Sequence, residues 1–168
     1  LTDSPPLYAH LPDYGVLVSS LSKTVAAGVR LGWIVASAPL LARIDPYAQS
    51  AHWGVSPLCL AIACQWISDG TARTRVQWQT EEVTRRWRLA KKILGPAMYQ
   101  TQTPSPHIWL TVAAGEAPLA QACHAAGVDV VSADAFAVKS TPTNAVRISL
   151  TAAPDAQTLK VALERVAA

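Results

Sequence analysis

The spacing of apolar positions changes along the chain, and each spacing predicts a different kind of element. Residues 16–18 and 31–36 are short apolar runs whose length and composition are typical of strands. Residues 57–68 form a longer and almost wholly apolar stretch, which predicts a helix. Ser56 suits the N-cap of this helix, and Pro57 suits its first position, where no backbone N–H is needed.

The longest periodic segment is residues 71–94, whose apolar side chains fall on one helical face. These are Val76, Val83, Trp87, Ala90 and Leu94. The basic side chains are distributed around the rest of the helix: Arg73, Arg75, Arg85, Arg86, Arg88, Lys91 and Lys92. A basic helix can bind nucleic acid, but Glu81 and Glu82 interrupt the charge and no aromatic platform accompanies it. We therefore interpret these charges as a solvated face of a helix that Gly95-Pro96 ends.

Shorter elements are predicted on both sides of these two helices. Residues 1–14 are rich in proline and predict a loop, and residues 38–48 predict a helix with Pro39 in its first turn. Toward the C-terminus we expect strands at 107–112, 128–131 and 145–150, helices at 117–126 and 153–166, and an irregular excursion at 134–144. Helix and strand alternate without hairpin turns, which indicates a small α/β or α+β unit.

Composition limits the classes of protein that fit this pattern. The chain has 168 residues, 51% of them hydrophobic and only 15% charged, so we expect part of its apolar surface to be buried against something outside the chain. A net charge of +3 is too small to argue for nucleic acid. No apolar stretch reaches the roughly 18 residues of a membrane span. Cys59, Cys64 and Cys123 lack metal-ligand spacing, and buried, unpaired thiols in a reducing cytoplasm are the default interpretation. No metal site is predicted.

The candidate chemistry lies in residues 20–33, where Ser-x-Ser-Lys is followed by Gly-x-Arg-x-Gly. Ser-x-Ser-Lys alone would be an ordinary surface turn. The combination with an arginine, two glycines and a following apolar run resembles the lysine-anchoring segment of the fold-type I pyridoxal 5'-phosphate (PLP) enzymes, the aspartate aminotransferase-like superfamily. This resemblance implies that Lys23 forms a Schiff base with PLP. It also implies that Ser20, Ser22 and Arg30 hold the cofactor phosphate through hydroxyl donors and a planar cation.

A second string, residues 145–150, resembles the C-terminal strand of the same superfamily. There an arginine binds the α-carboxylate of an amino-acid substrate, so the resemblance makes Arg147 the carboxylate-binding residue. Arg147 stands between inward-facing apolar neighbours, and its own side chain is expected on the opposite face of the strand. Phe136 lies where relatives have a Gly-x-x-Phe turn near the substrate, but Asp134 replaces part of that turn. Core packing is therefore the preferred interpretation of Phe136.

The resemblance extends over nearly the whole chain and implies an α/β fold. It comprises the C-terminal part of the PLP-dependent transferase large domain (residues 1–70), a connecting helix (71–95) and the small α/β C-terminal domain (96–168). The acidic residue, ring-stacking aromatic and Gly-rich phosphate loop that contact PLP in the family are not identifiable in residues 1–21. We therefore expect this chain to be a fragment with few cofactor contacts and no activity of its own.

Residues 53–58, 66–72 and 106–110 look like the MocR subgroup of GntR-type bacterial transcription regulators, and less closely like 2-aminoadipate-type aminotransferases. The regulators join a winged-helix DNA-binding domain to an aminotransferase-like domain that senses an effector. On this resemblance the parent is a cytoplasmic homodimer that binds an amino acid or amine. It contacts DNA only through an N-terminal domain absent here, and residues 50–56 reach the neighbouring subunit. The alternative parent is an aminotransferase in which Lys23 is the general base.

Overall fold

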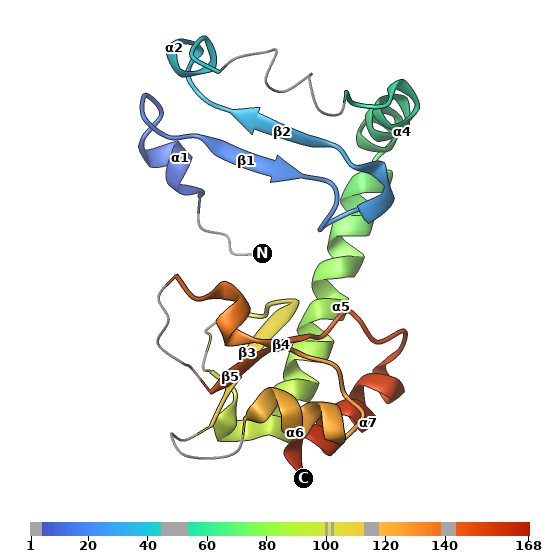
Figure 1. Cartoon of the computed structure of the whole chain (residues 1–168). Coiled ribbons are helices and arrows are strands. Elements are labelled where there is room, and N and C mark those ends of the chain that lie inside the picture. Colours follow the sequence, from blue (N-terminus) through green and yellow to red (C-terminus); the bar gives the residue numbers. More distant parts are fainter. Residues whose placement is uncertain (1–4, 45–53, 100, 102, 113–117, 139–143) are drawn as a thin grey trace. The chain divides into compact units, whose positions relative to one another are not determined.

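The computed structural model describes residues 5–44, 54–99, 101, 103–112, 118–138 and 144–168 (Figure 1). The chain divides into two units, Leu1–Thr80 and Glu81–Ala168, called unit 1 and unit 2 below. The boundary falls inside the long helix α5 (Thr71–Leu94), which begins and ends where the apolar period and Gly95-Pro96 predict.

Unit 1 contains a two-stranded antiparallel ribbon and several helices. Its elements are α1 (Leu7–His10), β1 (Leu17–Ser20), the 3₁₀ turn η1 (Ala27–Val29), β2 (Gly32–Val35), α2 (Ala38–Leu41), α4 (Pro57–Ser68) and the first part of α5. In the ribbon Val18 pairs with Ile34 and Ser20 pairs with Gly32. The predicted loop at 1–14 is wrong at the helical turn α1, and its residues 1–4 lie outside the described part of the chain. The helix predicted at 38–48 is observed over α2, and its residues 45–48 are not described.

The junction between α4 and α5 depends on the carboxylate of Asp69 and on the backbone of Gly70. Helix α4 begins at Pro57 after Ser56, as predicted, although the Ser56 hydroxyl makes no capping hydrogen bond. At the junction Asp69 Oδ1 accepts a hydrogen bond of 2.9 Å from the Thr71 N–H, and this bond lowers the pKa of Asp69. Gly70 has a φ of 84°, which a residue with a side chain rarely adopts. The sharp change of direction between the two helices follows from these two residues.

Unit 2 contains a three-stranded antiparallel sheet of order β3-β5-β4. Along the chain its helices lie before, between and after the strands. Its elements are the second part of α5, the 3₁₀ turn η2 (Gly95–Ala97), β3 (His107–Thr111), α6 (Leu119–Ala125), β4 (Val131–Ser132), the 3₁₀ turn η3 (Ala133–Phe136), β5 (Ala145–Ser149) and α7 (Ala156–Ala167). The strand predicted at 128–131 is observed only from residue 131, and the excursion predicted at 134–144 begins inside η3. Helix α7 begins after Asp155, whose carboxylate accepts a hydrogen bond of 2.7 Å from the Thr158 N–H.

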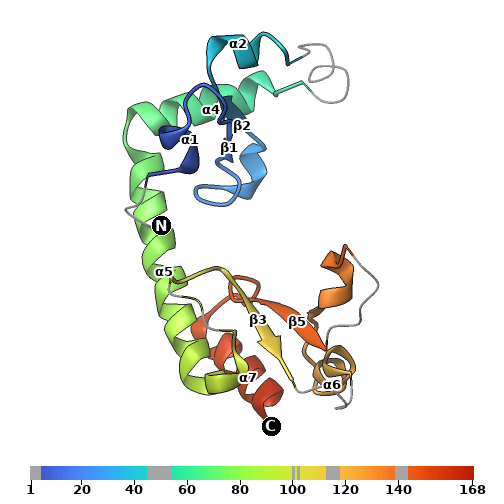
Figure 2. The same cartoon turned by 90° about the vertical axis from the view of Figure 1, so that its left-hand side faces the viewer.

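The core of unit 2 lies between the sheet and its helices. Side chains of α5, β3, α6, β5 and α7 contribute to one cluster of buried residues, in which Val146, Leu150 and Leu163 are the largest fully buried side chains. Both views show α6 and α7 together at the end of the unit that carries the C-terminus (Figures 1 and 2). In β5 the buried residues alternate with Arg147, which is half-buried on the other face, as the sequence predicts.

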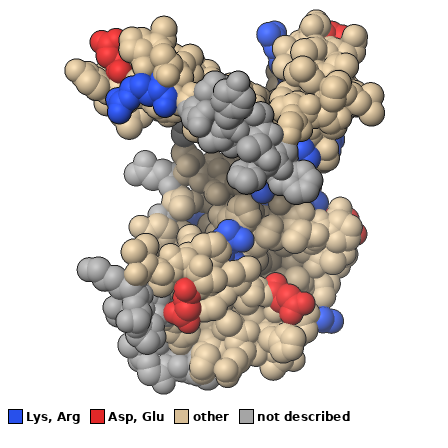
Figure 3. Space-filling model, turned by 45° about the horizontal axis from the view of Figure 1, so that its top comes forward, with Lys and Arg blue, Asp and Glu red and all other residues tan. Residues whose placement is uncertain are grey.

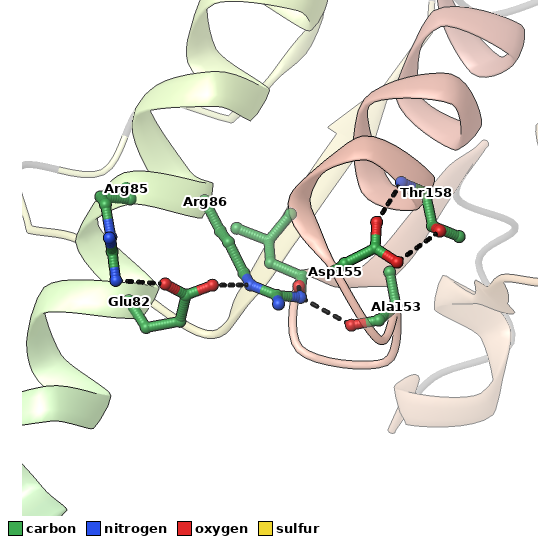
Figure 4. Close-up of polar contacts among 7 residues, drawn as sticks. Glu82, Arg85, Arg86, Ala153, Asp155 and Thr158 are labelled. Carbon is green, nitrogen blue, oxygen red and sulfur yellow. Dashed lines mark hydrogen bonds and ion pairs between the residues drawn. The ribbon is translucent and has the colours of Figure 1, made fainter.

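A buried arginine joins α5 to the connection that precedes α7 (Figure 4). Arg86 is 8% exposed, and its Nη1 donates to the backbone oxygens of Leu150 (2.9 Å) and Ala153 (2.7 Å). Its Nε donates to Glu82 Oε1 at 2.7 Å, and this bond is the main reason why the pKa of Glu82 is lowered. The prediction of a solvated basic face is therefore wrong for Arg86. The helical period already places Arg86 beside the buried Val83 and Ala90.

Two predictions about the surface can be compared with the described residues. Cys123 is buried, and burial raises its pKa, but Cys64 is exposed, so the prediction that the thiols are buried is wrong for Cys64. Within the described ranges no helix has the length and apolar character needed to span a membrane.

Candidate functional site

The connection between β1 and β2, together with the last residue of β1, holds four of the five residues for which the sequence predicts a role in binding. Three of its apolar residues, Leu21, Val25 and Val29, are buried with Ala63 of α4. The backbone closes on itself, because the Leu21 N–H donates to the Leu31 oxygen (3.0 Å) and the Val25 N–H donates to the Leu21 oxygen (2.8 Å). The connection is therefore fixed by its apolar residues and by its own hydrogen bonds.

Polar residues fill the positions between these buried anchors. Lys23 is exposed and Ser22 is half-buried in the turn that follows β1, and Ser20 is the last residue of β1. Lys23 is paired with none of the described acidic residues. The lysine thus lies on a short loop between two strands, as predicted, with a primary amine that a ligand in solvent can reach. The prediction that the two strands are buried is wrong, because β1 and β2 are half-buried or exposed at every residue.

Arg30 has an unusual backbone conformation. It follows η1 with φ 50° and ψ 32°, the left-handed region, and is the non-glycine residue with positive φ in the described part of the chain. For a residue with a β-carbon this conformation costs about 1–2 kcal/mol. Strained residues of this kind gather where a ligand or a switch constrains the chain. The strain therefore marks Arg30 as a functional candidate independently of the sequence motif.

The two glycines of the motif differ in their surroundings. A β-carbon on Gly32 would lie 3.0 Å from the Ser19 backbone oxygen, so the close approach of β1 and β2 excludes a side chain there. A β-carbon on Gly28 would meet no described atom within 4 Å, and Gly28 does not have a positive φ. Packing within the protein therefore explains why residue 32 is a glycine, but it does not explain the glycine at position 28.

A groove of about 780 Å³ runs along the ribbon and includes both Ser20 and Gly32. Its other lining residues are Val18, Ser19, Trp33, Ile34, Leu41 and Ile44. Most of these side chains are apolar, and Ser20 supplies a hydroxyl at the end of the strand. The groove can accommodate a small ring-containing molecule next to the lysine-bearing loop.

Arg75 also contacts this loop, although the sequence assigns it to the solvated face of α5. Its Nε donates to the Val25 backbone oxygen at 3.4 Å, and its guanidinium lies 4.2 Å from the centre of the Trp78 ring. Arg75 and Trp78 are three positions apart on one helix, so their spacing could have indicated the stacking. The contact with Val25 joins residues 50 positions apart, and local patterns do not report it.

Arg147, the fifth predicted residue, lies in unit 2 on the outer face of the sheet. Its cross-strand neighbours are Trp109 on β3 and Val131 on β4. The guanidinium carbon lies 4.6 Å from the centre of the Phe136 ring, and that ring meets Trp109 edge-to-face at 5.5 Å and 84°. Phe136 is 45% exposed, so the prediction that it packs in the core is wrong. Its exposed ring instead lies beneath the Arg147 guanidinium.

The sequence matches a known family along most of its length. The family "Aminotransferase class I and II" matches residues 5–166. The HTH-type transcriptional regulator YdfD of Bacillus subtilis, described as uncharacterized, is 29% identical over 86 residues, which are 51% of this chain and 18% of the regulator. The regulator YisV of the same organism, described in the same way, is 28% identical over 69 residues, or 41% of this chain and 14% of the regulator. The chain thus spans a minor part of the curated relatives that it matches.

Solved structures share the fold. A multiple substrate aminotransferase from Thermococcus profundus has a TM-score of 0.83 at 23% identity, over 99% of this chain and 43% of that enzyme. LysN, an α-aminoadipate aminotransferase from Thermus thermophilus, has a TM-score of 0.77 at 18% identity, over 90% of this chain and 40% of LysN. At these identities the likeness establishes the fold, and less than half of each enzyme is represented.

Proposed function

Because the chain belongs to the aminotransferase class I and II family, we propose that it is the C-terminal part of a PLP-binding effector domain in a GntR/MocR-type bacterial transcription regulator. The curated relatives named above are both HTH-type regulators, which favours a regulator over an enzyme. The observation that carries the proposal is the β1–β2 connection. It is pinned by buried residues, exposes Lys23, and ends in an arginine held in the left-handed region.

The residues on this connection fit PLP chemically. An aldehyde needs an accessible primary amine, and Lys23 is exposed. A phosphate needs a cation and small donors, which Arg30 and Ser22 supply from the connection and Ser20 supplies from the end of β1. When bound, PLP supplies an aldehyde for the lysine and an electron-withdrawing ring. Lys23 anchors the cofactor, while the guanidinium and the hydroxyls orient the phosphate.

Arg147 completes the proposal as the residue that binds a carboxylate. Its fork of N–H groups can take both oxygens of an α-carboxylate, so the ligand is an amino acid or an amine related to one. We further propose a cytoplasmic homodimer that contacts DNA through a separate winged-helix domain. The part of the 50–56 segment that would reach the second subunit includes residues 50–53, which lie outside the described residues.

The second candidate is an aminotransferase acting on an amino acid, favoured by the fold shared with enzymes such as LysN. In that case Lys23 both anchors the cofactor and moves a proton at the substrate α-carbon. The two candidates differ in turnover. With PLP and an excess of amino acid, the enzyme releases the corresponding keto acid repeatedly, whereas the regulator releases none.

The anchoring role of Lys23 is tested by trapping. The chain is incubated with excess PLP, reduced with borohydride and digested, and the modified lysine is identified by mass spectrometry. We expect the label on Lys23, loss of the label in Lys23→Ala, and no change in the matched control Lys92→Ala, which removes an exposed lysine from α5. Equal labelling of several lysines, or an unchanged yield in Lys23→Ala, contradicts the proposal. Because reduction captures weak adducts, the test also works if this part of the protein binds PLP loosely.

A further inference from the structure

The contact between Arg147 and Phe136, on the outer face of the unit 2 sheet, determines which groups of the guanidinium can bind a ligand. A guanidinium is planar, and its N–H groups point outward in that plane. The Arg147 guanidinium carbon lies over the Phe136 ring, 4.6 Å from its centre, which makes a cation–π contact. Among the described residues no oxygen accepts a hydrogen bond from these N–H groups, so the edge that would bind a carboxylate is left available.

No described carboxylate competes for that edge. The ion pairs among the described residues involve Arg85, Arg86, His124 and Lys160, and none includes Arg147. Arg86 gives the contrast within the same unit, because its N–H groups are used by Glu82 and two backbone oxygens. Unit 2 therefore holds Arg86 through hydrogen bonds and Arg147 through a cation–π contact.

The ring beneath Arg147 is itself held in place. Phe136 ends η3, a short turn that begins with the Ser132 Oγ accepting from the Asp134 N–H at 3.3 Å. Trp109 supports the ring edge-to-face from β3, and Trp109 is the cross-strand partner of Arg147. Phe136 is 45% exposed, so its contacts with Trp109 and Arg147, rather than burial in the core, account for the position of its ring.

We propose that Phe136, braced by Trp109, is a positioning residue that holds the Arg147 guanidinium ready for a carboxylate. This inference rests on the proposed carboxylate-binding role of Arg147. A long side chain that is already ordered loses less rotamer freedom when its ligand binds, and the gain appears as affinity. The aromatic ring thus acts on the ligand through Arg147.

Two variants separate this positioning role from simple packing. Phe136→Leu keeps an apolar side chain but removes the π face, whereas Phe136→Tyr keeps the face. Val138→Ala is the matched control, because Val138 is fully exposed two residues further along the same segment. Nuclear magnetic resonance of the whole chain reports the ring-current shift of the Arg147 side-chain protons and the order parameter of its Nε–H bond. The ring-current shift shows whether the contact is present in solution, and the order parameter separates positioning of Arg147 from simple packing, because loss of packing alone would not release Arg147 specifically.

We expect the shift and the order to be lost in Phe136→Leu, and to be retained in Phe136→Tyr and Val138→Ala. The Arg147 order parameter should fall to that of an exposed arginine such as Arg88. An unchanged Arg147 order parameter in Phe136→Leu overturns the inference, and so does the same loss in Phe136→Tyr. This arm needs no ligand.

The ligand arm uses L-leucine and 3-methylbutylamine, which differ only in the carboxylate. We expect leucine, but not the amine, to shift the Arg147 Nε–H signal, with affinity about 3- to 10-fold weaker in Phe136→Leu. Equal affinity in Phe136→Leu overturns the positioning role while the proposed function stands. An Arg147 signal that responds to neither probe in the unaltered chain overturns the carboxylate role, and the positioning role with it.

Discussion

Helices α4 and α7 have the same length, 12 residues, but opposite relations between composition and burial. Helix α4 has no charged residue, yet Leu58 is 69% exposed and Ala63 is its buried residue. Helix α7 carries charged residues on one side, yet Leu163 is only 1% exposed. The less apolar helix is the better buried one. Burial here is decided by whether a complementary surface is present, and unit 2 provides one for α7.

The same contrast holds for the two units as wholes. Among the described residues, the cluster in unit 2 has 12 buried residues, and that in unit 1 has four. Unit 1 exposes large apolar side chains on β1, β2 and α4. Most of the molecular face drawn in Figure 3, which includes both units, is neither acidic nor basic. A helix that is apolar on all sides is typical of one that is covered on all sides. Unit 1, which carries Lys23, therefore has more large apolar side chains than its own core buries.

The largest effect should come from truncating the core of unit 2. Leu163→Ala should lower the free energy of unfolding by about 2–5 kcal/mol, because it leaves a cavity beside fully buried neighbours. Leu58→Ala, the matched change on α4, should stay within about 0.5 kcal/mol, as exposed positions do. Urea unfolding combined with amide exchange in α7 and α4 measures both. A comparable cost for the two changes would mean that α4 is covered in solution.

The Arg86 contacts should give the next effect. Arg86→Met should cost about 2–3 kcal/mol, because two backbone oxygens and Glu82 lose their partner. The control is Arg85→Ala, whose pair with Glu82 joins an arginine side chain that is 65% exposed and should contribute well under 1 kcal/mol. Amide exchange near residues 150–155 should accelerate only in Arg86→Met. Similar exchange in both variants would contradict the assignment of Arg86 as the anchor.

Acid should weaken unit 2 partly through Glu82. Its pKa is lowered in the folded protein, first by the Arg86 hydrogen bond, so its contribution is fully present above the ordinary glutamate value of about 4.3. The contribution is lost as pH falls through the lower, folded value. Glu82→Gln should flatten this acid limb without removing it, since the Thr158 N–H also lowers the pKa of Asp155. Urea unfolding curves between neutral and strongly acid pH test this. The same loss of unfolding free energy with falling pH in the unaltered protein and in Glu82→Gln would rule it out.

The smallest effect should come from unit 1. Arg30→Gly relieves about 1–2 kcal/mol of left-handed strain but gives the unfolded chain about 0.4–1 kcal/mol of extra freedom. The net expectation is a stabilisation of about 0.5 kcal/mol together with weaker PLP trapping. Arg30→Ala keeps the strain and should weaken trapping without stabilising. Thermal unfolding and the borohydride assay separate these outcomes, and loss of stability in Arg30→Gly would exclude strain at this position.

The elements with local signals could be predicted from the sequence. Helix α4 starts at Pro57, and α5 stops before Gly95-Pro96, because a proline and a glycine determine those ends locally. The loop that carries Lys23 was likewise predicted, since its motif and the flanking apolar runs are contiguous. Short elements such as β4, with two residues, have no period to detect.

The remaining features depend on distant parts of the chain or on rare conformations. The helical period places Arg86 beside buried residues, but its hydrogen bonds reach backbone 64 and 67 positions away, and a pattern within α5 cannot report those partners. Phe136 was misassigned because its ring contacts Arg147 and Trp109, which lie on other strands and which no local pattern reports. The left-handed conformation of Arg30 is uncommon for arginine, and only the fold reveals it.

The strand order of unit 2 has a consequence for synthesis on the ribosome. β3 and β4 both pair with β5, so the last strand to be translated is the central one. Until residues 145–149 emerge from the exit tunnel, the two earlier strands lack the neighbour that they need and present open edges. The nascent unit therefore cannot close its sheet during most of its own translation. Unpaired strand edges of this kind are prone to aggregation for as long as they stay open.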